Sequence, residues 1–139
     1  MGLVRANIQL INCDDQAAKR LGLIEADEIR QITVNVLVDI GAEMLCINQY
    51  MQDQLQLPLI ETDTVQLADG SLLRCDVVGP VQIRFLNRQT ITEALVLPKD
   101  SDPLLGAIAL QGMDVVVDPV GRELRLPHDR PYKAMHIVK

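Results

Sequence analysis

The chain is poor in aromatic residues, which make up 2% of its 139 residues, with no tryptophan and a single phenylalanine. Hydrophobic residues nevertheless reach 48%. The core must therefore be built mainly from valine, isoleucine and leucine, and the β-branched members of this set favour strands. A chain of this length is expected to form one domain with a substantial core.

Other scarcities narrow the classes of function. Three cysteines without paired spacing argue against a disulfide framework and are typical of a reducing compartment. The apolar runs are shorter than a membrane span, and the chain does not open with a charged segment followed by a long apolar stretch. The net charge is −6 and the basic residues are scattered, which disfavours nucleic-acid binding. We therefore expect a soluble, cytoplasmic protein that binds neither membranes nor nucleic acid.

Motifs for several other chemistries are missing. Serine-nucleophile motifs, phosphate-binding glycine loops and zinc-ligand spacings do not occur. The two histidines, His128 and His136, lie in a polar C-terminal segment where a metal role is not expected. We expect neither a metal nor a cofactor.

Hydrophobic alternation and turn residues predict many short strands. Strands are expected over residues 3–11, 29–38, 64–67, 72–78, 81–85, 90–97, 114–118 and 123–126. Gly79-Pro80 is expected to break the chain between two of them. Residues 13–28 are expected to form a loop with a helical turn, whereas short helices are expected over 48–55 and, opened by residues 104–106, over 107–111. This pattern is typical of an all-β, barrel-like domain with one or two short helices.

The most informative segment is Val-Leu-Val-Asp-Ile-Gly-Ala at residues 36–42, where an apolar strand runs directly into an acid. Asp39 is expected at the mouth of the sheet, with its carboxylate held against apolar surroundings. That setting favours an acid or base over a solvated surface charge. An isolated Asp-x-Gly after a strand is nevertheless most often an ordinary turn.

Two later segments add to this pattern. Ala68-Asp69-Gly70-Ser71 contains the Asp-Gly pair that favours a tight hairpin turn. Leu104-Leu105-Gly106 is an apolar pair followed by glycine, just ahead of the helix expected over 107–111.

Taken in order over roughly residues 3–126, these three segments resemble the retropepsins, the single-domain aspartic proteases, and their bacterial and archaeal relatives. That family has an Asp-Thr/Ser-Gly-Ala turn with the catalytic acid, a hairpin that forms a flap, and an apolar-apolar-Gly element behind the turn. The resemblance implies a retropepsin-like closed barrel over residues 1–126, followed by a C-terminal tail over 127–139.

The resemblance also implies roles for individual residues. Asp39 would be catalytic, and the three supporting groups would be the active-site turn (Ile40, Gly41, Ala42), the substrate-binding flap (Ala68, Asp69, Gly70, Ser71) and the structural support (Leu104, Leu105, Gly106). Because the chemistry uses two carboxylates and the chain has one such turn, the implied enzyme is a two-fold homodimer. Its substrate would be an extended peptide or an unfolded protein segment, cleaved without a cofactor.

The chain departs from the family pattern at Ile40. The family has a threonine or serine there, whose hydroxyl hydrogen-bonds across the dimer axis, and an isoleucine cannot do so. One alternative is therefore a catalytically inactive dimer that serves as a peptide-binding or scaffold module. Another is a β-barrel domain with a coincidental resemblance and no dimer.

Overall fold

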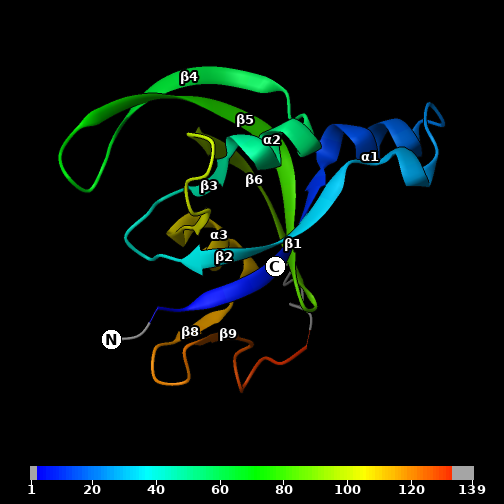
Figure 1. Ribbon diagram of the computed structural model, residues 1–139. Coiled ribbons are helices and arrows are strands. Elements are labelled where there is room, and N and C mark those ends of the chain that lie inside the picture. Colours follow the sequence, from blue (N-terminus) through cyan, green and yellow to red (C-terminus); the bar gives the residue numbers. More distant parts are fainter. Residues whose placement is uncertain (1–2, 133–139) are drawn as a thin grey trace, which may run out of the picture.

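The computed structural model describes residues 3–132, and β-strands hold far more of these residues than helices do, as expected for an all-β chain. Short helices interrupt the strands (Figure 1). The elements in chain order are β1 (Arg5–Asn12), α1 (Cys13–Arg20), the 3-10 helix η1 (Ala26–Glu28), β2 (Gln31–Val38), β3 (Leu45–Asn48), α2 (Gln49–Leu55), β4 (Leu59–Gln66), β5 (Leu72–Phe85), β6 (Arg88–Leu97), β7 (Leu104–Leu105), α3 (Ala107–Met113), β8 (Val116–Asp118) and β9 (Glu123–Arg125).

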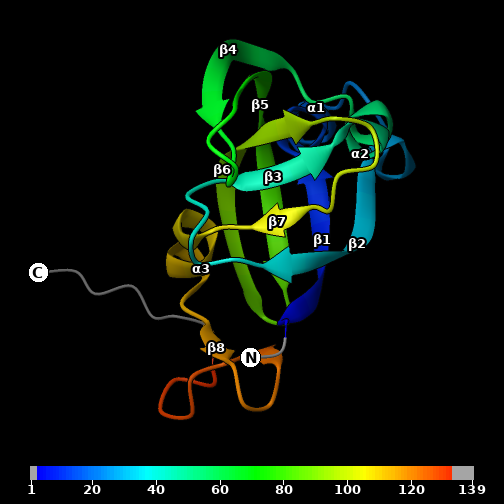
Figure 2. The same cartoon turned by 60° about the vertical axis from the view of Figure 1, so that its left-hand side comes forward.

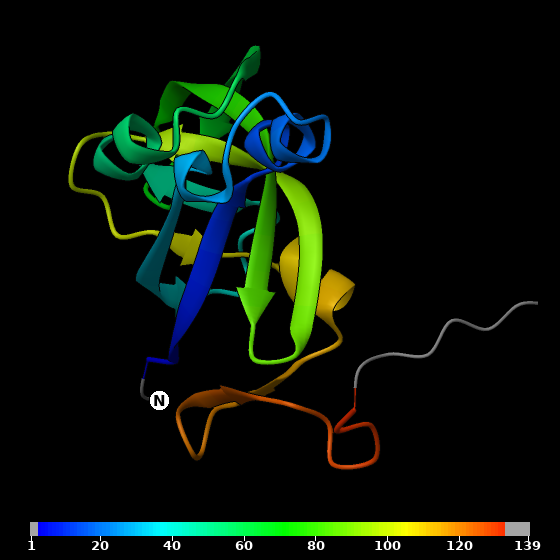
Figure 3. The same cartoon turned by 90° about the vertical axis from the view of Figure 1, so that its right-hand side faces the viewer.

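Seven of the strands form one sheet in the order β1-β2-β7-β3-β6-β5-β4, and β1 also pairs with β5. The hydrogen-bonded order therefore returns to β1, with β4 attached outside this ring of pairings. Strands β8 and β9 form a separate two-stranded sheet. This small sheet lies at one end of the molecule, whereas α1 and α2 lie at the other (Figure 3).

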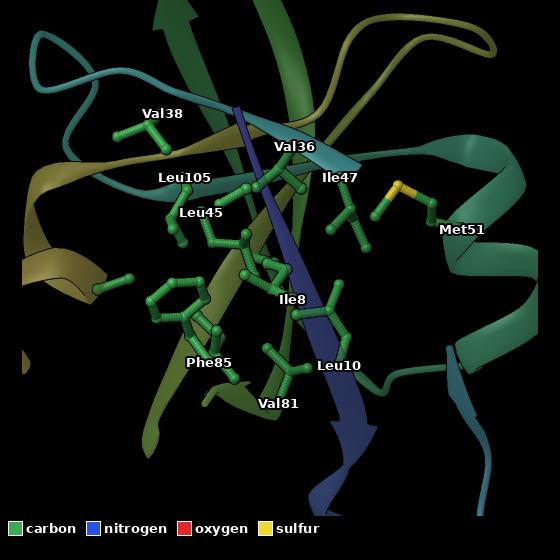
Figure 4. Close-up of a cluster of buried hydrophobic side chains, with 14 of the residues drawn as sticks. Ile8, Leu10, Val36, Val38, Leu45, Ile47, Met51, Val81, Phe85 and Leu105 are labelled. Carbon is green, nitrogen blue, oxygen red and sulfur yellow. The ribbon is translucent and has the colours of Figure 1, made fainter. Parts of the chain in front are cut away.

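The main core is aliphatic and lies inside the ring of paired strands (Figure 4). On β1, Ala6, Ile8 and Leu10 are buried and alternate with more exposed residues, which is the period-two pattern of a strand. Phe85 is the single phenylalanine and belongs to this core. Each fully buried aliphatic side chain contributes about 1.5–3 kcal/mol, so packing of Val, Ile and Leu supplies the stability that aromatics supply elsewhere.

A second, smaller cluster lies outside that core and includes two cysteines. Cys46 of β3 and Cys75 of β5 are both buried in it, together with Val77 and Leu95. Burial is the main cause that raises the pKa of the Cys46 thiol to about 11, and burial also raises the pKa of Cys75. Both thiols are therefore protonated at neutral pH and serve as small apolar residues.

The prediction of a strand break at Gly79-Pro80 was wrong. Strand β5 continues through both residues, and its pairing with β6 is irregular between Val78 and Val81. Proline lacks an N–H group and is tolerated in a sheet at such a bulge. Before the irregularity β5 pairs with β4, and after it β5 pairs with β1. The irregularity therefore lets the single strand β5 pair with β4 along its first part and with β1 along its second part.

Three other expectations need correction. Residues 13–20 form a helix of eight residues, longer than the helical turn expected within a loop over 13–28, because the Asn12 side chain accepts a hydrogen bond from the Asp15 N–H at 3.0 Å and caps it. Strand β4 begins at Leu59, earlier than expected, because it pairs with β5 along its length. Leu104 and Leu105 form a strand rather than the opening of a helix. By contrast, the helix capped by Asn48 was predicted correctly.

Residues 127–132 contact the rest of the fold. The Arg130 guanidinium donates two hydrogen bonds to the Asp114 carboxylate, at 2.9 and 3.1 Å. Asn87 donates to the Pro131 carbonyl at 3.1 Å, and buried Arg88 donates to the Arg130 carbonyl. The first part of the expected tail is thus attached, whereas residues 133–139, with His136, lie outside the described residues.

Within residues 3–132, no helix combines the length and the apolar character needed to cross a membrane.

Candidate functional site

Asp39 follows directly on β2 and is half-buried. Its backbone N–H donates to the Leu105 carbonyl at 3.1 Å, and its own carbonyl accepts from the Ala42 N–H at 3.2 Å. Its carboxylate oxygen Oδ1 accepts from the Gly41 N–H at 2.9 Å. The other oxygen, Oδ2, accepts no hydrogen bond from residues 3–132. The turn thus orients one carboxylate oxygen and leaves the other available for a ligand.

Gly41 is matched to this geometry. A β-carbon at position 41 would lie 3.2 Å from Asp39 Oδ1, which is closer than ordinary packing allows. A larger residue would therefore push the carboxylate away from the backbone N–H that orients it.

The turn is supported from behind by β7. This strand lies between β2 and β3. It runs parallel to β2, with Leu104 opposite Leu37. It runs antiparallel to β3, with Leu104 opposite Cys46. Figure 2 shows β7 between the two strands that flank the Asp39 turn. The end of β2 and the start of β3 are therefore held at a fixed separation.

Gly106 and the first residues of α3 complete this support. A β-carbon at Gly106 would lie 2.5 Å from the Met44 carbonyl oxygen, so the backbones touch there. The Ala107 N–H donates to the Ala42 carbonyl at 2.8 Å, and the Ile108 N–H donates to the Glu43 carbonyl at 3.0 Å. The structure thus brings residues 104–106 and the Asp39 turn together.

The hairpin formed by β4 and β5 extends over the same side of the molecule as the Asp39 turn (Figures 1 and 2). At its tip Gly70 has φ +87°, which favours glycine. Asp69 Oδ1 accepts from the Ser71 N–H at 2.9 Å and from the Ser71 hydroxyl at 2.5 Å. These hydrogen bonds lower the pKa of Asp69, so its carboxylate holds the turn as an anion and accepts from within the hairpin.

Ile40 projects from the turn and is 73% exposed. It lines an open groove of about 550 Å³, which we call the Ile40 groove and whose other lining residues are Ala107, Leu110, Gln111, Asp114, Val115 and Val117. No sequence pattern predicted this groove, since it joins two segments that are distant along the chain, the Asp39 turn and residues 107–117. A smaller hollow of about 210 Å³ lies along β5 of the hairpin, lined by Gln49, residues 73–76 and residues 96–98.

The described residues offer carboxylate chemistry and no metal centre. Across residues 3–132, no three His, Cys, Asp or Glu side chains gather closely enough to hold a metal ion. One oriented carboxylate beside solvent can take a proton from water or give one to a substrate. A single carboxylate cannot do both in the same step, so hydrolysis by this route needs a second acid.

No protein-family model and no curated protein matches this chain.

Proposed function

We propose that the chain is a retropepsin-like aspartic endopeptidase that acts as a two-fold homodimer, with one Asp39 from each subunit. The observation that carries the proposal is the Asp39 turn: a carboxylate at the end of a strand, oriented by the Gly41 N–H and backed by Gly106. The hairpin on the same side of the molecule adds support. So does the ring of strand pairings, which we interpret as a closed barrel.

In the proposed reaction the two Asp39 carboxylates lie about 3 Å apart and share one proton, because two charged carboxylates at that distance repel each other. The charged carboxylate takes a proton from a water molecule that attacks the peptide carbonyl. The protonated carboxyl gives its proton to the carbonyl oxygen, which forms a tetrahedral intermediate. When this intermediate collapses, the peptide C–N bond breaks, the carboxyl that took the proton from water gives it to the leaving amine nitrogen, and the other carboxylate takes back a proton from the intermediate's hydroxyl. The Gly41 N–H keeps each carboxylate in position throughout.

The proposed substrate is an extended peptide or an unfolded protein segment that lies under the hairpin. An extended chain adds to strands through its backbone hydrogen bonds and presents alternate side chains to pockets. Apolar surface for such side chains is offered by partly buried residues that pack around the cysteine cluster. These residues are Met44, Val65, Leu73, Leu97 and Leu104. Since all three cysteines are free thiols, we include the reducing cytoplasm in the proposal.

A second candidate keeps the dimer and drops the catalysis. Ile40 favours it, because the residue next to Asp39 has no hydroxyl with which to stabilise a pair of turns. In that case the same surface would bind an extended peptide and release it uncut.

The deciding experiment is cleavage of a diverse peptide mixture from acid to neutral pH, read by mass spectrometry, with Asp39→Asn as the control. The proposal expects cuts that disappear in Asp39→Asn while the variant keeps its fold and its dimer. Cuts that persist in the variant would exclude the carboxylate pair. A folded wild-type dimer that binds peptides without cutting them would favour the second candidate.

A further inference from the structure

The exposed side chain of Ile40 has a defined apolar neighbourhood. Single exposed apolar residues are common on protein surfaces and need no explanation. Ile40 differs because it lies on the rim of an open groove that is walled by Ala107, Leu110, Val115 and Val117. An exposed aliphatic side chain therefore stands beside an unfilled aliphatic groove.

The polar residues of the Ile40 groove do not make it a site for a charged ligand. Asp114 is its one charged residue, and its carboxylate already accepts two hydrogen bonds from Arg130. Those bonds satisfy the carboxylate and balance its charge, so a cation gains little there. Apart from exposed Gln111, the rest of the lining is aliphatic, and an aliphatic group is the occupant that matches it.

The position of Ile40 in the chain decides which occupant reaches the groove. Ile40 follows Asp39, so their Cα atoms are about 3.8 Å apart. A two-fold axis that brings two Asp39 carboxylates within about 3 Å must also pass close to both Ile40 residues. Since Ile40 also lines the groove of its own subunit, the axis passes near that groove, and Ile40 of the second copy comes within reach of it.

We propose that Ile40 is a positioning residue whose side chain packs into the Ile40 groove of the second copy and holds the two Asp39 turns in register by apolar contact. The inference rests on the proposed function for the position of the axis. Burial of the two exposed isoleucines would take the place of a hydroxyl network. The interface would therefore weaken only slightly when salt is added, unlike one held by surface charges.

The sharpest test compares Ile40→Val with Ile40→Thr, because the two new side chains have nearly the same shape and differ in a hydroxyl. Dimer dissociation constants from sedimentation velocity are the readout. Apolar packing predicts about tenfold weaker dimers for Ile40→Val, since one methylene is lost from each subunit. It predicts dimers that are weaker still for Ile40→Thr, whose hydroxyl loses water on burial. A dimer that is tighter with Thr than with Val would overturn the inference.

The groove is tested by its own variants and by a matched control. Val117→Ala should weaken the dimer, and its effect should fall when Ile40→Ala is already present, because the two side chains share one contact. Ile91→Ala is the control, since Ile91 is 61% exposed on β6 and does not line the groove. An equal effect of Ile91→Ala and Ile40→Ala would overturn the inference.

A positioning role also predicts an effect within the intact dimer. At protein concentrations far above the dissociation constant, Ile40→Val should lower kcat and shift the pH profile of cleavage with little change in KM, because the carboxylate separation changes. An unchanged kcat and pH profile would show that Ile40 contacts the partner without positioning the Asp39 carboxylates, and would overturn the positioning role.

The inference and the proposed function fail in different ways. Dimers that depend on Ile40 but cut no peptide would overturn the proposed protease function and support the proposed Ile40 interface. Asp39-dependent cleavage by dimers whose dissociation constant does not change in Ile40→Ala would overturn the proposed Ile40 interface and support the protease function. A chain that stays monomeric at every accessible concentration would overturn both.

Discussion

Gly106 and the Met44 carbonyl are in direct backbone contact, because a β-carbon at position 106 would lie only 2.5 Å from the Met44 oxygen. The same β-carbon would lie 2.8 Å from the Ala42 oxygen. The φ of Gly106 is −89°, a value that any residue adopts, so the glycine is needed for space and not for backbone conformation.

We therefore expect Gly106→Ala to lower the free energy of unfolding by about 1–3 kcal/mol, as other overpacked sites do. Urea denaturation followed by circular dichroism measures this. Gly121→Ala is the control, because the atoms nearest its β-carbon would belong to the side chains of Asp118 and Glu123 and not to the backbone. Equal stability of the Gly106 variant and the wild type would contradict the close contact behind the Asp39 turn.

Arg88 provides a second prediction, since this side chain is buried and its Nε and Nη1 atoms have no hydrogen-bond partner among residues 3–132. Arg88→Met removes the two nitrogens that make no hydrogen bond, together with the hydrogen bond to the Arg130 carbonyl and the 3.7 Å ion pair with Asp114. It keeps most of the volume, so stability should stay within about 1 kcal/mol of the wild type or rise. Arg88→Ala leaves a cavity and should lower stability by about 2 kcal/mol or more. Thermal unfolding compares the two. A methionine variant as unstable as the alanine variant would show that the charge itself is needed.

A third prediction concerns acid stability. The buried Asp15 carboxylate accepts hydrogen bonds from the Arg30 guanidinium at 2.8 and 2.8 Å, and these lower the pKa of Asp15 below its usual value. A lowered folded-state pKa stabilises the fold above the unfolded value of about 3.9, and this gain is lost as the pH falls through the folded value. At neutral pH, Asp15→Asn should therefore cost about 1–3 kcal/mol.

The difference between the wild type and Asp15→Asn should shrink below about pH 4, where the carboxyl of the unfolded chain takes up a proton, and should be lost once the pH falls below the lowered folded-state pKa of Asp15. Urea denaturation at several pH values measures it, with exposed Asp14→Asn as the neighbouring control. A difference that is independent of pH would mean that packing rather than charge explains the effect. The result also sets the lowest pH at which cleavage assays test a folded protein.

The hairpin tip carries the fourth prediction. Gly70 has φ +87° and open space around it, so Gly70→Ala should cost about 1 kcal/mol through backbone conformation alone. Amide hydrogen exchange at Leu67 and at position 70 should become faster, because these amides close the turn. If the hairpin covers substrate, the KM for cleavage should rise as well.

Gly22→Ala is the matched control for this variant. Gly22 has φ +77° and equally open surroundings, but it follows α1 and not the hairpin. It should cost similar stability without changing KM. If KM rises in both variants, the rise is not specific to the hairpin, and the hairpin is not shown to bind substrate.

Local signals in the sequence predicted local structure well. Alternation along β1, the Asn48 cap of α2 and the Asp69-Gly70 turn each depend on residues within a few positions of one another. The cap of α1 is also a local feature. Asn12, followed by Asp14 and Asp15 in the first turn, is a typical helix start that the sequence analysis missed.

Non-local structure could not be predicted in the same way. Leu104 and Leu105 look like the opening of a helix, and only their pairing with β2 and β3 makes them a strand. Likewise the Asp39 turn could be predicted from adjacent residues, whereas the groove beside Ile40 depends on how α3 and the chain leading into β8 pack. Its lining residues are ordinary aliphatics, which carry no sequence signal for a site.

The position of β7 also orders events during protein synthesis. The two ends of the Asp39 turn emerge from the ribosome early, yet the strand that holds them apart comes much later in the chain. Contacts between distant segments form slowly and only once both segments are available. In a nascent chain Asp39 therefore lacks its final surroundings, and its turn reaches its folded geometry only when residues 104–106 have been made.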